Sequence, residues 1–285
     1  MRAAATEWLD KQRPRAVHLD QSICVCAPII HEAHMTLPDL YQHQLFKEVV
    51  ADSVAIHSSL GMKLTDEIDE SRTLDELQFY VLRVGFSLSH AASWIEQLHH
   101  AVHFMTDFRY GKKASSAGVT RSHHLLYNIE NYLIRMVSVY DRCLQLANAV
   151  FHLCISDEHV NHSAIVSNLH VSRTDVPKLL KAVRKPIKDQ EQERHKLIHR
   201  HSQDDPELRR IQLLYMHTKE TWGDDRKLPY EGLVHVRGQL VKKFTAQRTK
   251  EYAEINRELL SAIGPYLDGL LTEYRRQKAR LEKLV

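Results

Sequence analysis

The apolar residues of this chain recur at the spacing of α-helices. Two long stretches, 73–108 and 122–155, place apolar side chains three or four positions apart, which puts them on one face of a helix. A further long helix is expected over 175–202, with Asp175 as its cap and Pro177 in its first turn. Shorter helices are expected over 38–59 and 206–217. The strongest stripe, in the stretch 122–155, consists of Leu125, Ile129, Leu133, Met136, Val139, Cys143, Leu146, Val150 and Leu153. The pattern predicts long antiparallel helices.

Glycine, proline and small polar residues indicate where these helices end. The stretch 111–118, Gly-Lys-Lys-Ala-Ser-Ser-Ala-Gly, predicts an exposed loop between the second and third helices. Pro186 should bend the helix over 175–202, and Gly264-Pro265 should divide the C-terminal region into a pair of helices.

The chain is expected to fall into three regions. Residues 1–36 carry two prolines among β-branched residues and are interpreted as an irregular N-terminal arm. Residues 37–220 form the helical bundle, and residues 221–285 form a basic C-terminal helical extension.

Composition supports an all-α fold. The chain has 285 residues, of which 43% are apolar and 26% charged, and its 9 Gly and 8 Pro are too few for a β-sandwich or barrel. No apolar stretch approaches the ~20 residues of a membrane-spanning helix, so we expect a protein with no membrane association and no signal peptide. The four cysteines show no metal-binding CxxC spacing and favour a reducing cytoplasm. Cys143 and Cys154 are interpreted as core residues of the third helix.

Basic residues gather towards the C-terminus, although the net charge of the whole chain is only +3. Such a region could follow an RNA backbone, but a solvated helix face explains it slightly better. The residues concerned are Lys242, Lys243, Arg248, Arg275, Arg276, Lys278 and Arg280.

Charged and titratable side chains are most concentrated in the segment 191–202, which has two arginines and three histidines between Arg194 and His201. Its sequence is Glu-Gln-Glu-Arg-His-Lys-Leu-Ile-His-Arg-His-Ser. One interpretation is a solvated cationic face near a helix C-terminus. A second is a zinc site, because His195 and His199 stand at i and i+4. Lys196 occupies the position where a zinc protease has Glu, so no metal or other cofactor is expected.

The same segment resembles the Arg-x4-6-His signature of the HEPN superfamily, with Arg194, His195 and His199 matching its form. The resemblance covers roughly residues 70–220. It implies an all-α HEPN-like helical bundle, often a ribonuclease, in which two protomers bring their motifs together in a dimer cleft.

In such a site an RNA 2'-hydroxyl attacks the neighbouring phosphate. His199 is assigned to acid/base work, Arg194 to stabilising the developing negative charge, and His195 to orientation or phosphate contact. On a straight helix Arg194 and His199 lie about 140° apart, whereas Arg194 and His201 lie only about 20° apart. His201 is therefore an alternative to His199.

The third helix is expected to support the motif. Asn131, Arg135 and Arg142 are spaced to share one stripe, and Glu130 and Asp141 share another beside it. Glu130 or Asp141 could hold Arg194, and Asn131 could bind the catalytic histidine. Solvated or salt-bridged charges are the alternative.

Three tyrosines of the third helix are interpreted as packing residues rather than as platforms for stacked bases. They are Tyr127, Tyr132 and Tyr140.

The function expected from the resemblance is a metal-independent endoribonuclease for single-stranded RNA, acting as a homodimer in a toxin or defence setting, with an antitoxin or other regulatory protein as a further partner. The alternative is a non-catalytic HEPN-like module that dimerises and binds RNA, a nucleotide or a protein.

Overall fold

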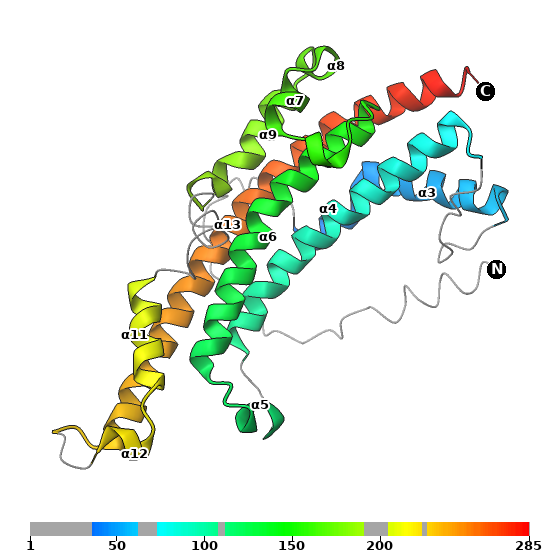
Figure 1. The fold of residues 1–285 in the computed structure, drawn as a ribbon. Coiled ribbons are helices and arrows are strands. Elements are labelled where there is room, and N and C mark those ends of the chain that lie inside the picture. Colours follow the sequence, from blue (N-terminus) through cyan, green and yellow to red (C-terminus); the bar gives the residue numbers. More distant parts are fainter. Residues whose placement is uncertain (1–35, 62–72, 108–111, 191–204, 224–226, 285) are drawn as a thin grey trace, which may run out of the picture. The chain divides into compact units, whose positions relative to one another are not determined.

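The computed structural model describes residues 36–61, 73–107, 112–190, 205–223 and 227–284. Within these ranges the chain is helical and contains no strand (Figure 1). The α-helices are α2 (Leu37–Gln42), α3 (Gln44–Ser59), α4 (Glu76–Thr106), α5 (Lys112–Ser116), α6 (Arg121–Val150), α7 (His162–Val166), α8 (Leu169–Ser172), α9 (Val176–Arg184), α11 (Pro206–Tyr215), α12 (Lys219–Trp222) and α13 (Tyr230–Leu281). The described residues also form the 3₁₀ helices η1 (Asp157–His159) and η2 (Lys185–Gln190). The predicted all-α fold is confirmed.

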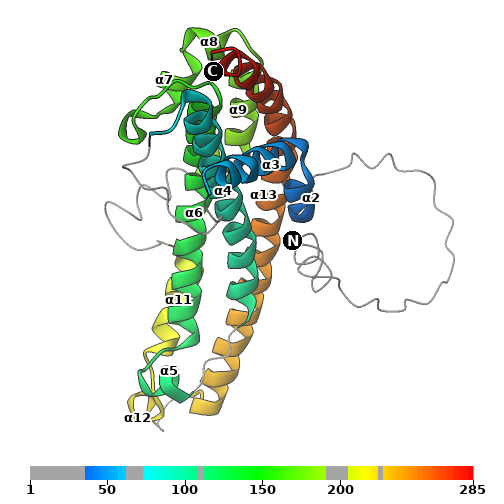
Figure 2. The same ribbon diagram turned by 90° about the vertical axis from the view of Figure 1, so that its right-hand side faces the viewer.

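Helices α4 and α6 form the centre of the bundle, and α13 packs along both (Figure 2). Their facing apolar stripes are buried in one core, which also includes residues of α3, α9 and α11. None of the described helices is long and apolar enough to cross a membrane.

Tyrosine hydroxyls attach α13 to the core at several points. Tyr266 donates to the carbonyl oxygen of Cys143 at 2.6 Å, and Tyr274 donates to Asp52 Oδ2 at 2.6 Å. Tyr132 of α6 donates to Asn256 Oδ1 of α13 at 2.9 Å and stacks on Tyr252 with ring centroids 3.8 Å apart. A buried hydroxyl needs a partner, so these bonds fix how α13 lies against α6.

The predicted pair of C-terminal helices is wrong, because α13 continues through Gly264-Pro265 as one helix. Pro265 is exposed, so the distortion caused by its ring and its missing N–H falls on the solvent side. Ile263 and Tyr266 on either side are buried, and their packing keeps the helix continuous.

Other helix ends also differ from the prediction. The predicted helix 38–59 is interrupted at His43, whose imidazole accepts from the Leu45 amide and bonds Asp268 at 3.0 Å. The predicted loop 111–118 contains the short helix α5.

The helix expected over 122–155 ends at Val150. The helix expected to start at 175 changes to 3₁₀ geometry at Lys185, next to Pro186, and its continuation beyond Gln190 lies outside the described residues.

Candidate functional site

The motif residues Arg194, His195, His199 and His201 lie outside the described residues. The elements before and after them are described. The preceding helix η2 packs against α6, α9 and α13, and the following helix α11 packs against α6 and α13. The motif is thus connected at both ends to elements that contact α6 and α13.

Asp205 anchors the chain directly after the motif segment. Its Oδ1 caps α11 by accepting from the amides of Glu207 and Leu208 at 2.8 and 3.1 Å. Its Oδ2 accepts from the Arg248 guanidinium of α13, and the Asp205 side chain is only 5% exposed. Burial disfavours the charge on Arg248, but Glu251 and Asp205 outweigh burial and raise the pKa of Arg248. This buried pair fixes the start of α11 on α13.

The third-helix stripe converges on a tryptophan of α4. Arg135 and Arg142 are seven residues apart, close to two helical turns, and so lie on one face of α6. Their guanidinium carbons lie 5.0 and 5.3 Å from the centroid of the Trp94 ring. At this distance each cation is attracted by the electron-rich face of the indole. We call Trp94, Arg135 and Arg142 the arginine cluster.

Among the described residues, neutral amides bind the two guanidinium groups. Arg135 donates from Nε to Asn131 Oδ1 at 2.9 Å and from Nη1 to Gln97 Oε1. Arg142 donates from Nη1 to Gln145 Oε1 at 2.6 Å.

Within the described ranges neither arginine has a carboxylate at ion-pair distance. The Nε of Arg142 is buried and lacks an acceptor there. Buried donors without partners are rare, so the arginine cluster combines uncompensated charge with spare hydrogen-bonding capacity.

The other predicted supporting residues lie on α6. Asn131 and Glu130 are half-buried, and Asp141 is exposed. Asn131 accepts a hydrogen bond from Arg135. Whether Glu130 or Asp141 holds Arg194 falls outside the described residues.

A tyrosine–histidine pair lies next to the point where α9 leads into η2. The Tyr140 hydroxyl and His162 Nδ1 are 2.5 Å apart, and the Arg184 guanidinium lies 5.7 Å from the centre of the Tyr140 ring. No pattern in the sequence points to a function for His162, since a single histidine in a chain with 20 of them is weak evidence. Trp94 was also missed, because it stands within the apolar stripe of α4.

The packing role expected of the three tyrosines is confirmed for Tyr132 and Tyr140, which are buried, and is wrong for Tyr127, which is 70% exposed. Tyr127 is two residues from both Leu125 and Ile129, about 200° around the helix from each, so it points away from the core that buries them.

Basic residues of α13 pair with carboxylates. Arg275 pairs with Glu48, and Lys278 Nζ lies 2.7 Å from Asp52 Oδ1. Hydrogen bonds from Arg275 and Gln44 lower the pKa of Glu48 to about 2. Much of the cationic character of α13 is therefore neutralised within the molecule.

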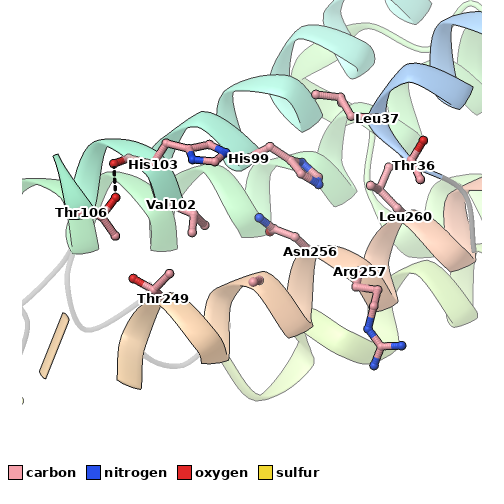
Figure 3. A pocket seen from close by; sticks show the side chains of 11 residues that line it. Thr36, Leu37, His99, Val102, His103, Thr106, Thr249, Asn256, Arg257 and Leu260 are labelled. Atoms are coloured by element: carbon pink, nitrogen blue, oxygen red, sulfur yellow. Dashed lines mark hydrogen bonds between the residues drawn. The ribbon is translucent and has the colours of Figure 1, made fainter. Parts of the chain in front are cut away.

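A cavity of about 530 Å³ lies between α4, α13 and the start of α2. Figure 3 shows His99 and Asn256 pointing into the space between the two long helices, with Val102 and Leu260 among the apolar lining residues. Burial lowers the pKa of His99, so its imidazole is held in the neutral form. This cavity offers an apolar wall and neutral polar groups.

No group of three or more His, Cys, Asp or Glu side chains in the described ranges could hold a metal ion.

Comparison with known protein families assigns the chain to one of them. The model of the Cthe2314-like HEPN family matches residues 72–235, more than half of the chain. No curated protein and no solved structure matches the chain. The matched range begins just before α4 and extends into the first turns of α13, so it contains both the arginine cluster and the motif segment. The chain belongs to the HEPN superfamily.

Proposed function

We propose that this protein is a metal-independent endoribonuclease that cleaves single-stranded RNA through attack of the 2'-hydroxyl on the adjacent phosphate. His199 accepts the proton of the hydroxyl, and Arg194 stabilises the negative charge that develops on the phosphate oxygens. The 5'-oxygen leaves with a proton, which gives a 2',3'-cyclic phosphate and a 5'-hydroxyl. His195 contacts or orients the phosphate, and His201 is the alternative acid/base.

Membership of the HEPN superfamily supports this proposal, since the Arg-x4-6-His form lies within the matched range. The observation that carries it is the arginine cluster on α6. Two guanidinium groups meet at one tryptophan and, in the part of the chain that the structure describes, hydrogen-bond to amides alone, an arrangement that suits phosphate oxygens better than a structural ion pair.

In the proposed complex Arg135 and Arg142 bind RNA phosphates next to the cleaved bond. Two protomers pair so that one groove receives both motifs, as the family resemblance implies. A toxin or defence role, with an antitoxin or other regulatory protein as partner, is proposed on the same resemblance.

The test is cleavage of a labelled single-stranded RNA by the full chain in EDTA. Wild-type cleavage should persist, and Arg194→Ala and His199→Ala should each abolish it while the helical circular dichroism signal is kept. Arg173→Gln is the matched control, since Arg173 is an exposed arginine outside both the motif and the arginine cluster. Comparison of His199→Ala with His201→Ala identifies the acid/base group.

Two outcomes would overturn the proposal. Cleavage that stops on chelation and returns with zinc would favour a metal site. RNA that stays intact while the chain dimerises and binds RNA would favour the second function, a non-catalytic binding module.

A further inference from the structure

The segment after α6 contains two unusual backbone conformations. His152 and Cys154 have φ values of 53° and 54°, in the left-handed region that side chains other than glycine rarely adopt. Such conformations are strained and persist only where the surroundings impose them.

A buried asparagine near the end of α6, Asn148, holds this segment in place through three hydrogen bonds. The Asn148 side chain accepts from the Ile155 amide at 3.1 Å and donates to the Ile155 carbonyl oxygen at 2.8 Å. The Asn148 carbonyl oxygen accepts from the Leu153 amide at 3.0 Å. These three bonds fold the segment 151–155 back onto the end of α6 and hold Cys154 in one position.

This conformation explains why the prediction that Cys154 belongs to the helix core is wrong. Cys154 lies four residues beyond the end of α6 and is exposed, whereas Cys143 lies within α6 and is buried. Burial raises the pKa of the Cys143 thiol to about 12, so Cys143 is an inert core residue.

Two polar side chains lie next to the Cys154 sulfur, and a third lies next to one of these two. Arg83 of α4 donates from Nη1 to the sulfur of Cys154 at 3.2 Å. His152 Nδ1 lies 4.0 Å from the same sulfur. His152 Nε2 lies 2.5 Å from Glu76 Oε1, so the carboxylate favours a proton on Nε2 and leaves Nδ1 as the acceptor that faces the thiol. A thiol, an imidazole and a carboxylate in this order form a nucleophile with its base and the group that orients the base.

A cavity of about 390 Å³ adjoins this cluster. Its lining residues include Glu76, His152, His170 and Arg280. Arg280 is exposed and has no carboxylate partner in the described ranges. Arg83 lies against the Cys154 sulfur and Arg280 lines the cavity next to His152, so both cations would attract a small anionic molecule to this region.

We propose that Cys154 is a modification site that forms a mixed disulfide with a small anionic thiol. His152 Nδ1 accepts the Cys154 proton as the sulfur attacks one sulfur of a symmetric disulfide. The bond between the two sulfurs of that disulfide breaks, a bond forms between Cys154 and the attacked sulfur, and the departing thiolate takes up the proton. The net change converts the Cys154 thiol and the disulfide into a mixed disulfide and one free thiol.

Arg83 stabilises negative charge on the sulfur, and Glu76 is a positioning residue that acts through His152. No residue of the ribonuclease motif takes part. This modification is therefore independent of the proposed function.

The experiment incubates the full chain with oxidised glutathione at neutral pH and follows mixed-disulfide formation at each cysteine by tandem mass spectrometry. His152→Asn and Arg83→Gln should each slow the reaction of Cys154 at least about ten-fold. Asparagine is chosen because it tolerates a positive φ better than most residues. His90→Asn and Arg173→Gln, exposed residues outside the cluster, should change the rate less than about two-fold.

A second disulfide tests the adjoining cavity. Arg280→Gln should slow the reaction with oxidised glutathione about three-fold and leave the reaction with uncharged hydroxyethyl disulfide unchanged. An equal effect on both reagents would overturn the role assigned to Arg280.

The wild-type chain unfolded in urea gives a reference that needs no variant to fold. Cys154 should react at least about ten-fold faster in the native chain than in the unfolded chain. A native Cys154 that reacts no faster than the unfolded one, or folded His152→Asn and Arg83→Gln variants that react as fast as wild type, would overturn the proposal.

Discussion

Helices α6 and α13 both carry groups of cations, but the two groups have different partners. On α13, Arg248, Arg275 and Lys278 each lie against a carboxylate. On α6, Arg135 and Arg142 lie against an indole ring and neutral amides.

The difference shows that a count of basic residues does not identify a binding surface. α13 carries more cations, yet many of their charges stabilise contacts within the molecule. The arginine cluster has fewer charges, and the proposed function assigns these to RNA phosphates. Structural cations should therefore affect stability when substituted, and cations of a binding site should affect RNA affinity.

The largest expected effect is on stability, at the buried pair of α11 and α13. Asp205→Ala removes the cap of α11 and one of the two carboxylates that bind Arg248, whose side chain is 24% exposed, and leaves Glu251 as the other. The free energy of unfolding should fall by about 3 kcal/mol. Urea unfolding followed by circular dichroism measures it, with Arg142→Gln as a comparison that should change stability by no more than about 0.5 kcal/mol. If both variants lost the same free energy of unfolding, the cations of α6 and α13 would not differ in their structural role.

The next effect is on RNA affinity at the arginine cluster. The double variant Arg135→Gln/Arg142→Gln should weaken binding of single-stranded RNA about 10- to 30-fold, because each arginine contributes a charge-assisted contact to phosphate. The slope of log affinity against log salt concentration should also become shallower by about 1.4. Fluorescence anisotropy across a salt series tests both, and an unchanged slope would mean that these arginines do not contact phosphate.

A smaller effect is expected for the neutralised cations of α13. Arg275→Gln should change RNA affinity by less than about two-fold, since this guanidinium already pairs with Glu48. The same anisotropy assay applies. A loss as large as that of the α6 double variant would show that RNA also follows α13.

The smallest effect concerns the cavity between α4 and α13. Burial places the pKa of His99 below 6.5 in the folded chain, so the unfolded chain takes up this proton first as the pH falls. This contribution to stability is present above about pH 6.5 and is lost as the pH drops below that value. His99→Gln should make the melting temperature less dependent on pH between 7.5 and 5.5. A steeper dependence in the variant would contradict the assignment.

The sequence predicted the elements whose burial is set locally. Helices α4 and α6 carry long stripes at helical spacing, and the structure buries those stripes. The spacing of Asn131, Arg135 and Arg142 also predicted correctly that they share one face of α6.

Features that depend on distant partners escaped prediction. The break at His43 involves Asp268, more than 200 residues away, and α13 stays continuous at Pro265 because its neighbours pack into a core that the local pattern does not show. The role of Trp94 depends on two arginines from another helix. The exposure of Cys154 depends on how Asn148 ends α6.

The chemical nature of the RNA ends tests the central claim most directly. A single-stranded RNA is incubated with the wild-type chain in EDTA, and the products are analysed by mass spectrometry. The proposed attack by the 2'-hydroxyl predicts fragments with a 2',3'-cyclic phosphate and a 5'-hydroxyl, which disappear in Arg194→Ala. Fragments with a 3'-hydroxyl and a 5'-phosphate, or RNA that remains intact, would contradict it.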